Sequence, residues 1–199
     1  MIVHIAQNIL RVIKNMLIFR FTQSVLARFI VFCLLVFLVN FVSAAEAYNS
    51  SKVKSAYIFN FVQYVFWPNE GAMKVLNIGF YGEDKEYYQA LKQMQGKRIR
   101  GLSLSINKVS SLSKNQTLHV LVVGEAKSFS LAGIAKQLQE QATLLVSDKA
   151  HDKKNTMLNF ISTSEKTLSF EVNRYNMLNA NLKVSPDILV LGGTELDID

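Results

Sequence analysis

The chain of 199 residues contains one cysteine, two prolines and three histidines. The cysteine, Cys33, lies in an apolar stretch near the N-terminus that we interpret as part of a removable leader. The protein that remains would have no thiol, no disulfide and no cysteine ligand for a metal. Its stability must therefore come from a packed core.

Side chains that transfer protons, attack substrates or bind metals are also scarce. Outside the leader only His119 and His151 remain, and we interpret them as a packed or surface strand residue and a solvated loop residue. Asp148, His151 and Asp152 could bind a divalent ion, but the lysines around them favour a solvated loop. The chain has no G-x-S-x-G, HExxH or Walker motif. We predict no catalytic residue, no metal and no cofactor, and so a protein that is not an enzyme.

An apolar run near the N-terminus predicts export. This run, Phe29–Val42, has the length of a signal-peptide core and is shorter than the roughly 20 residues that span a bilayer. Arg20 and Arg28 precede it, and small residues follow it. We therefore predict a signal peptide over residues 1–47 and export of the rest.

Two details of this leader stay open. Cleavage would follow Ala47 or Ala44, and Met16 is an alternative start that gives a leader of conventional length. An uncleaved membrane anchor is the competing interpretation, because Ile13–Phe21 is also fairly apolar.

Residues 48–199 have the size of a single domain. They retain 18 basic and 14 acidic residues, so the net charge falls from +7 for the whole chain to +4. This mild basicity gives no support for a nucleic-acid partner, which would need a clustered basic face. We find no internal repeat and no linker long enough to divide the domain.

The segment Lys52–Pro68 predicts a helix with more apolar surface than one core contact needs. Pro68 is expected to end it. One stripe would face the core: Val53, Ala56, Tyr57, Phe61, Tyr64 and Val65. We predict that a second stripe forms the surface for a partner or a homodimer: Ile58, Phe59, Val62, Phe66 and Trp67. Ordinary packing of this stripe against a sheet is the alternative.

Apolar runs and amphipathic segments alternate along the next part of the chain. The expected strands are Val75–Tyr81, Ile99–Val109, Leu118–Val123 and Thr143–Val146. The expected helices between them are Asp84–Gln95 and Ser130–Gln141. Strands that alternate with helices are typical of a mostly parallel sheet with helical crossovers.

The C-terminal part predicts an antiparallel hairpin of Met157–Ile161 with Thr167–Val172. Asn173 and Ser185 would cap two short helices, the last one ending at Gly192. The predicted fold class is α/β: a single domain with a mostly parallel central sheet, helices on both faces and an added C-terminal hairpin. This is a Rossmann-like three-layer sandwich.

Loops at the carboxyl ends of parallel strands are the usual binding places in such sheets. They could hold a small ligand or a peptide, or they could be ordinary turns. The residues concerned are Tyr81, Gly82, Glu83, Gly124, Glu125, Ser147 and Asp148.

The order of several motifs resembles the YfiR family, and the resemblance covers nearly all of residues 48–199. The matching segments are Val53–Phe61 with Trp67-Pro68, Ile78–Gly82, Gly96-Lys97, Leu121–Val123, Leu145–Asp148, Met157–Phe160, Phe170–Asn173, Leu182 and Ser185–Leu191. Two features differ from the family. Lys153-Lys154-Asn155 stands where glycines are frequent, and the disulfides of some members are impossible here, which puts redox control in doubt.

The resemblance implies an α/β sandwich-like domain, often dimeric, without enzymatic activity. It implies a periplasmic protein that binds the periplasmic sensor domain of an inner-membrane diguanylate cyclase and represses cyclic di-GMP synthesis and biofilm growth. An OmpA-like outer-membrane lipoprotein is the partner expected to release it. The alternative function is a periplasmic small-ligand-binding module that reports to a membrane sensor kinase.

Overall fold

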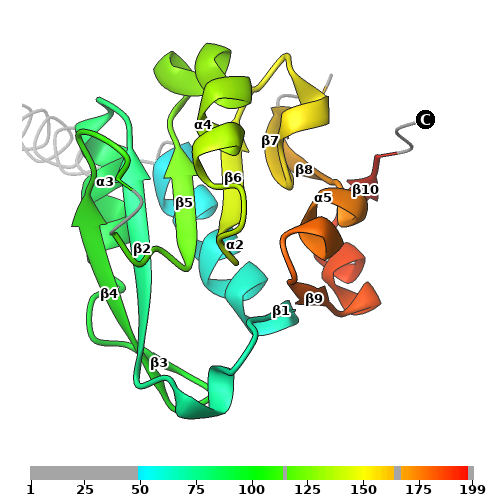
Figure 1. The fold of residues 1–199 in the computed structure, drawn as a ribbon. Coiled ribbons are helices and arrows are strands. Elements are labelled where there is room, and N and C mark those ends of the chain that lie inside the picture. The colour runs from blue at the N-terminus through cyan, green and yellow to red at the C-terminus, as the bar shows by residue number, and fades with distance from the viewer. Residues whose placement is uncertain (1–48, 114–115, 164–166, 197–199) are drawn as a thin grey trace, which may run out of the picture. The chain divides into compact units, whose positions relative to one another are not determined.

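The computed structural model describes residues 49–113, 116–163 and 167–196 (Figure 1). Asn49–Asp199 forms one compact unit. Its helices are α2 (Ser50–Tyr64), α3 (Lys85–Lys92), α4 (Leu131–Gln137) and α5 (Arg174–Asn179), with 3₁₀ turns η1 (Glu70–Ala72), η2 (Glu125–Ser130), η3 (Lys153–Asn155) and η4 (Pro186–Leu191). Its strands are β1 (Val65–Phe66), β2 (Val75–Tyr81), β3 (Arg98–Ile99), β4 (Leu102–Lys108), β5 (Val120–Val123), β6 (Leu144–Asp148), β7 (Leu158–Ser162), β8 (Leu168–Val172), β9 (Lys183–Val184) and β10 (Gly193–Glu195).

The main sheet has eight strands in the order β10-β8-β7-β6-β5-β2-β4-β3. Its central strands β4, β2, β5, β6 and β7 run parallel, and so do β8 and β10. The predicted hairpin is confirmed, because β7 and β8 pair antiparallel with Phe160 opposite Phe170. The predicted α/β class with a mostly parallel sheet is confirmed as well.

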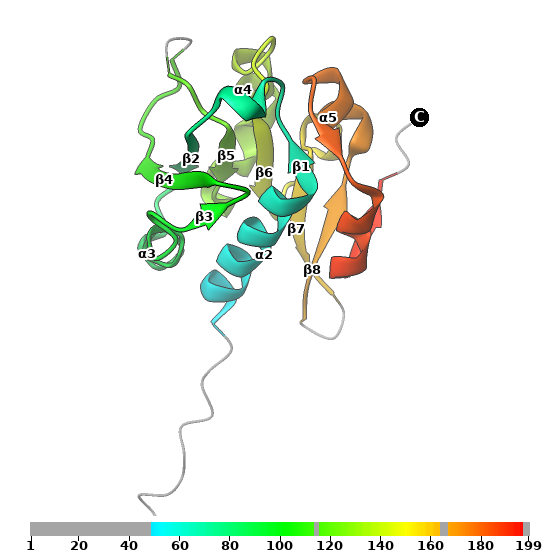
Figure 2. The same cartoon turned by 90° about the horizontal axis from the view of Figure 1, so that it is seen from below.

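Helices cover both faces of this sheet. Figure 1 shows α4 in front of the central strands and α2 behind them, and Figure 2 shows α3 beside β3 and β4. Two separate apolar clusters fill the layers: a larger one under α2 and α3 that includes Phe61 and Phe80, and a smaller one under α4 that includes Leu121 and Leu138. The arrangement is a three-layer sandwich.

The first helix ends earlier than the sequence predicted. Val65, not the residue before Pro68, closes α2, because Val65 and Phe66 turn into the extended strand β1. This strand pairs antiparallel with β9, with Val65 opposite Val184. Arg100 donates hydrogen bonds to the carbonyl oxygens of Val62, Gln63 and Val65, so it satisfies acceptors that the end of the helix leaves open. Contacts with distant residues therefore set this boundary.

Two other predictions needed correction. The single strand expected over Ile99–Val109 is a hairpin of β3 and β4, joined by Arg100 and Gly101, which both adopt positive φ. The final helix is a 3₁₀ turn, η4, and Gly192 at its end also has positive φ. The chain then adds β10, which pairs parallel with β8.

Candidate functional site

The one buried stripe of α2 combines residues from both of the apolar stripes that the sequence predicted. The buried positions recur every three or four residues: Ser51, Lys54, Ser55, Ile58, Phe61, Val62 and Val65. Three of them are polar and lie in the first two turns, so a pattern search based on apolar residues misplaces the buried face by part of a turn. Ala56, predicted to face the core, is exposed.

This placement corrects the exposure expected of the second stripe. Ile58 and Val62 are fully buried, and Trp67 is nearly so; its indole Nε1 donates to the carbonyl oxygen of His119 at 3.0 Å. Phe59 is half-buried, and 39% of Phe66 is exposed. Only these two aromatic side chains of the set can reach a partner directly.

The two accessible aromatic side chains each lie close to a cation. The Arg100 guanidinium carbon is 4.6 Å from the centre of the Phe66 ring, and Lys97 Nζ is 5.8 Å from that of Phe59. Arg100 also forms an ion pair with Glu70, Nε to Oε1 2.7 Å. Burial raises the pKa of Glu70, but the bonds from Arg100 and the Trp67 amide outweigh it, so the pKa lies below its ordinary value.

Phe59 lines a hollow of about 290 Å³ between α2 and α3. Met94 and Ala90 of the α3 side contribute apolar surface, and Lys52 and Lys97 lie at the hollow as well. Aromatic and methionine side chains are enriched in protein interfaces.

The predicted ligand loops do meet at the carboxyl edge of the sheet. Tyr81 pairs with Val123, which pairs with Ser147 on the next strand. Their backbones pack so closely that a Cβ on Gly82 would lie 3.2 Å from the Cα of Gly124 and 2.8 Å from the Phe80 ring. Protein groups therefore occupy much of the space between these loops. Glu83 and Glu125 lie at the surface and pair with lysines.

Ser147 is buried and bonded within the protein. Its hydroxyl lies 2.7 Å from that of Thr156 and 3.0 Å from Oδ1 of Asn159. Asn159 in turn donates to Glu171, whose other carboxylate oxygen pairs with Lys153. This polar network joins β6, β7 and β8, so its evident role is structural.

Asp148 belongs to a buried ion pair that no sequence pattern predicted. Its Oδ2 lies 2.5 Å from Nζ of Lys54 on α2, and the two side chains are 5% and 10% exposed. Burial raises the pKa of Asp148, while Lys54 opposes that shift. Tyr87 lies beside the pair, with Lys54 Nζ 5.4 Å from its ring centre. Burial, and then the charge of Asp148, raise the pKa of Tyr87 well above its ordinary value.

His119 lies outside the strand in which the sequence placed it, whereas His151 lies in the predicted loop. His119 lies just before β5, and its Nδ1 accepts a hydrogen bond from the amide of Asn77 at 2.9 Å. Burial lowers its pKa. His151 is exposed in a loop. Among the described residues, no group of three or more histidine, aspartate or glutamate side chains could hold a metal ion.

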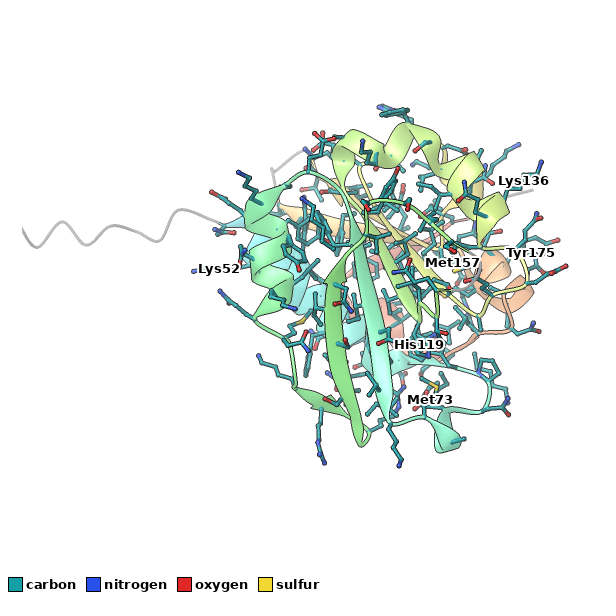
Figure 3. All side chains as sticks on the ribbon, turned by 60° about the vertical axis from the view of Figure 1, so that its left-hand side comes forward. Lys52, Met73, His119, Lys136, Met157 and Tyr175 are labelled. Carbon is teal, nitrogen blue, oxygen red and sulfur yellow. The ribbon has the colours of Figure 1, made fainter. Side chains whose placement is uncertain are left out.

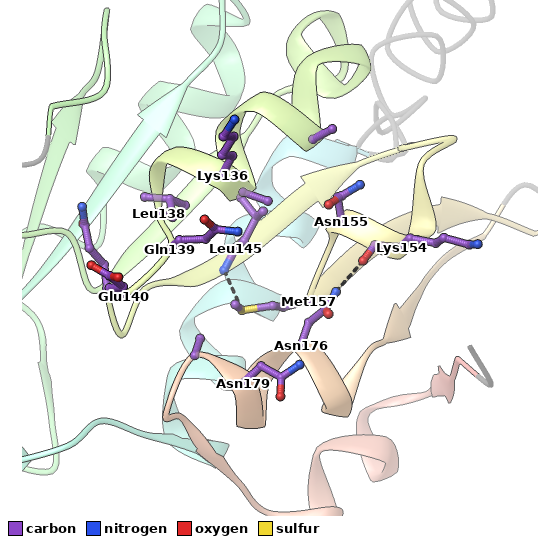
Figure 4. Close-up of a pocket in the computed structure, with 14 residues that line it drawn as sticks. Lys136, Leu138, Gln139, Glu140, Leu145, Lys154, Asn155, Met157, Asn176 and Asn179 are labelled. Atoms are coloured by element: carbon purple, nitrogen blue, oxygen red, sulfur yellow. Dashed lines mark hydrogen bonds between the residues drawn. The ribbon is translucent and has the colours of Figure 1, made fainter. Parts of the chain in front are cut away.

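A hollow larger than the one beside Phe59 lies near the amino ends of the strands, away from the predicted loops. It measures about 360 Å³ and lies between the end of α4, the segment before β7, and α5 (Figure 4). We call it the α4–α5 hollow. Its apolar surface comes from Ala135, Leu138, Leu145, Met157 and Ala180, and its uncharged polar surface from Gln139, Gln141, Asn155, Asn176 and Asn179.

A second hollow of about 420 Å³ adjoins it, since Gln141 lines both. Trp67, Met73 and His119 contribute to this second hollow. Figure 3 shows Met157 near Lys136 and Tyr175 on one face of the domain, with His119 and Met73 further along that face. Sequence reasoning missed both hollows, because their linings come from segments without a shared motif.

Comparison with known proteins gives one family. A family model described as YfiR/HmsC-like matches residues 51–193. No curated protein matches the chain. Within the described residues, no helix is long and apolar enough to cross a membrane.

Proposed function

The chain belongs to the YfiR/HmsC-like family, and on that basis we propose that it is a periplasmic repressor of a membrane-bound diguanylate cyclase. It binds the periplasmic sensor domain of the cyclase and holds the enzyme in its inactive state. Cyclic di-GMP synthesis falls, and biofilm formation falls with it. The observation that carries this proposal is the family match, which extends over residues 51–193.

The surface of α2 and β1 supports a protein-binding role. Phe59 and Phe66 are both accessible, each beside a basic side chain, and Phe59 borders an open hollow. Aromatic residues that a partner can cover are typical anchors of protein interfaces. We propose these two residues as part of the cyclase contact or of a homodimer interface. Ile58, Val62 and Trp67 would support that surface from beneath.

Repression of this kind is a shift of populations. A protein that binds the inactive state of the cyclase more tightly than the active state favours the inactive state by no more than that difference in affinity. Release then requires a competitor for the repressor, for which we propose an OmpA-like outer-membrane lipoprotein.

Co-purification from solubilised membranes tests the proposal. The exported protein, immobilised through a C-terminal tag, should retain one diguanylate cyclase in stoichiometric amount, and deletion of the gene should raise cellular cyclic di-GMP. The variant Phe66→Ala should retain less of the cyclase. Unchanged cyclic di-GMP in the deletion strain, with no cyclase retained, would refute the proposed function.

The α4–α5 hollow favours one alternative, a periplasmic ligand-binding module that reports to a membrane sensor kinase. Its volume of about 360 Å³ falls within the range of small-molecule sites. Native mass spectrometry of protein purified from the periplasm distinguishes the two functions. A bound low-molecular-weight compound together with a retained kinase would support the module and contradict repression.

A further inference from the structure

The floor of the α4–α5 hollow contains a backbone donor with a weak partner. In the part of the chain that the structure describes, the Leu145 amide bonds no carbonyl oxygen, and its partner is the thioether Sδ of Met157 at 3.3 Å. Figure 4 shows this bond in the middle of the hollow. A thioether is a weak acceptor, and an unsatisfied buried N–H is costly, so a carbonyl oxygen would be a better partner there.

This donor is found where the sheet ladder starts. The pairing of β6 with β7 begins at Val146 and Leu158, one residue after Leu145 and Met157. The Met157 amide still donates to the Leu145 carbonyl at 3.3 Å, but Leu145 has no strand partner for its own amide. The Leu145 amide at the floor of the hollow is thus a backbone donor that the β6–β7 ladder does not use, one position before that ladder begins.

The walls of the hollow carry carboxamide groups with unused bonding capacity. Gln139 at the end of α4 and Asn179 at the end of α5 form no side-chain hydrogen bond with the rest of the described chain. The Nδ2 of Asn176 donates to the carbonyl oxygens of Lys154 and Thr156, at 2.7 and 2.8 Å, so its Oδ1 remains as an acceptor. Each carboxamide offers the same donor and acceptor types as a peptide group.

The remaining surface combines an apolar base with charged side chains that lie in solvent. Leu138 and Leu145 are buried at the base, and Ala135 and Ala180 add small apolar surface. Three charged side chains also line the hollow, Lys136, Glu140 and Lys154, and all three are exposed (Figure 4). A ligand charge at the apolar base would lose water, so an uncharged group suits that part of the hollow.

We propose that the α4–α5 hollow binds a short, uncharged, peptide-like molecule whose carbonyl oxygen accepts the Leu145 N–H in place of Met157 Sδ. An apolar side chain of the ligand packs against Leu138, and the carboxamides bond its other peptide groups. Met157 can move aside because its side chain has three rotatable bonds and adapts to its neighbours. This site goes beyond repression of a cyclase, and its test needs no cyclase.

The test is an NMR titration of the exported protein with the capped tripeptide acetyl-Ala-Leu-Ala-amide. The Leu145 amide and the Met157 methyl signals should shift together and saturate, with a dissociation constant on the order of 0.1 to 1 mM for a ligand of this size. The charged probe acetyl-Ala-Glu-Ala-amide should bind about tenfold more weakly. Failure of both signals to shift would overturn the proposal.

Three variants separate this mechanism from nonspecific binding. Met157→Leu removes the competing acceptor at similar volume and should tighten binding roughly threefold to tenfold. Ala132→Trp places a large ring at the mouth of the hollow and should abolish binding. Ala126→Trp changes another exposed alanine, in η2 outside the lining, and should leave binding unchanged. Equal affinity in Ala132→Trp and Ala126→Trp, or weaker binding by Met157→Leu, would contradict the proposed site.

Discussion

Lys54 shows how much of this fold depends on a single polar residue. It lies on the buried stripe of α2, and its ammonium group has Asp148 as an ion-pair partner at 2.5 Å. The second oxygen of Asp148 and the hydroxyl of Tyr87 are buried and have no hydrogen-bond partner among the described residues. The carboxylate therefore depends on Lys54 for most of its compensation.

We predict that Lys54→Met destabilises the protein by about 3–5 kcal/mol at neutral pH, because it leaves a buried carboxylate unpaired. This loss of stability should be smallest near pH 4. When the pKa of a carboxyl group is raised in the folded state, the protein loses stability as the pH rises above the pKa of that group in the unfolded state, about 3.9. Urea denaturation measures the effect. Adding Asp148→Asn should restore much of the stability, and a double variant as unstable as the single one would show that the charge is not the cause.

His119 gives a second prediction at this scale. Burial lowers its pKa, and its Nδ1 accepts the Asn77 amide proton, so protonation is opposed in the folded state. A base whose pKa is lowered in the folded state stabilises the protein at pH values above its pKa in the unfolded state, about 6.5. This stabilisation disappears as the pH falls below that pKa. His119→Asn retains an acceptor oxygen without the titration.

The melting temperature of the parent should therefore fall more between pH 7.5 and pH 5.5 than that of His119→Asn. The exposed His151 provides the control, and His151→Asn should keep the parent's pH dependence. An identical pH dependence in the parent and in His119→Asn would exclude this role for His119.

At the scale of elements, α2 combines a buried face with an accessible one. We predict that Ile58→Ala lowers the free energy of unfolding by about 2–5 kcal/mol, because it creates a cavity in the core. Phe59→Ala and Phe66→Ala should change stability much less, since both rings are partly in solvent. They should weaken self-association or cyclase binding, by roughly 2 kcal/mol for a central anchor. Thermal melting and analytical ultracentrifugation check both parts. Strong destabilisation with full affinity would place both rings in the core.

The strand β10 depends on a glycine. A Cβ on Gly193 would lie only 2.2 Å from the Phe170 ring, so Gly193→Ala should push β10 away from β8 and cost about 1–3 kcal/mol. Gly133 in α4 provides a matched control, because a Cβ there meets nothing within 4 Å. Gly133→Ala should stabilise the protein by roughly 0.5–1 kcal/mol. Chemical denaturation of both variants gives the comparison, and equal stability would show that Phe170 yields readily.

At the scale of the whole molecule, the prediction concerns the segment before Asn49, which lies outside the described residues. We expect the signal peptide over residues 1–47 to be removed on export. Amino-terminal sequencing of the protein from a periplasmic extract should begin at Tyr48 or Ala45. A membrane-bound protein whose sequence begins before Phe29 would instead support the uncleaved anchor.

The sequence alone determined the elements that depend on local pattern. The strands Val75–Tyr81 and Leu118–Val123 were predicted close to their observed limits, because strands buried on both faces are continuous apolar runs. The caps at Asn173 and Ser185 were equally visible, since each side chain bonds an amide two or three residues away.

Only the tertiary structure decided the orientation of α2 and the place of the hollows. Lys54 is buried because Asp148 lies beside it, although 94 positions separate them in the chain. The helix ends at Tyr64 because β9 pairs with the next two residues and Arg100 donates to the Val65 carbonyl oxygen. Apolar periodicity predicts burial only where the buried residues are apolar. A buried charge and a backbone donor outside the sheet ladder depend on partners that folding brings from elsewhere in the chain.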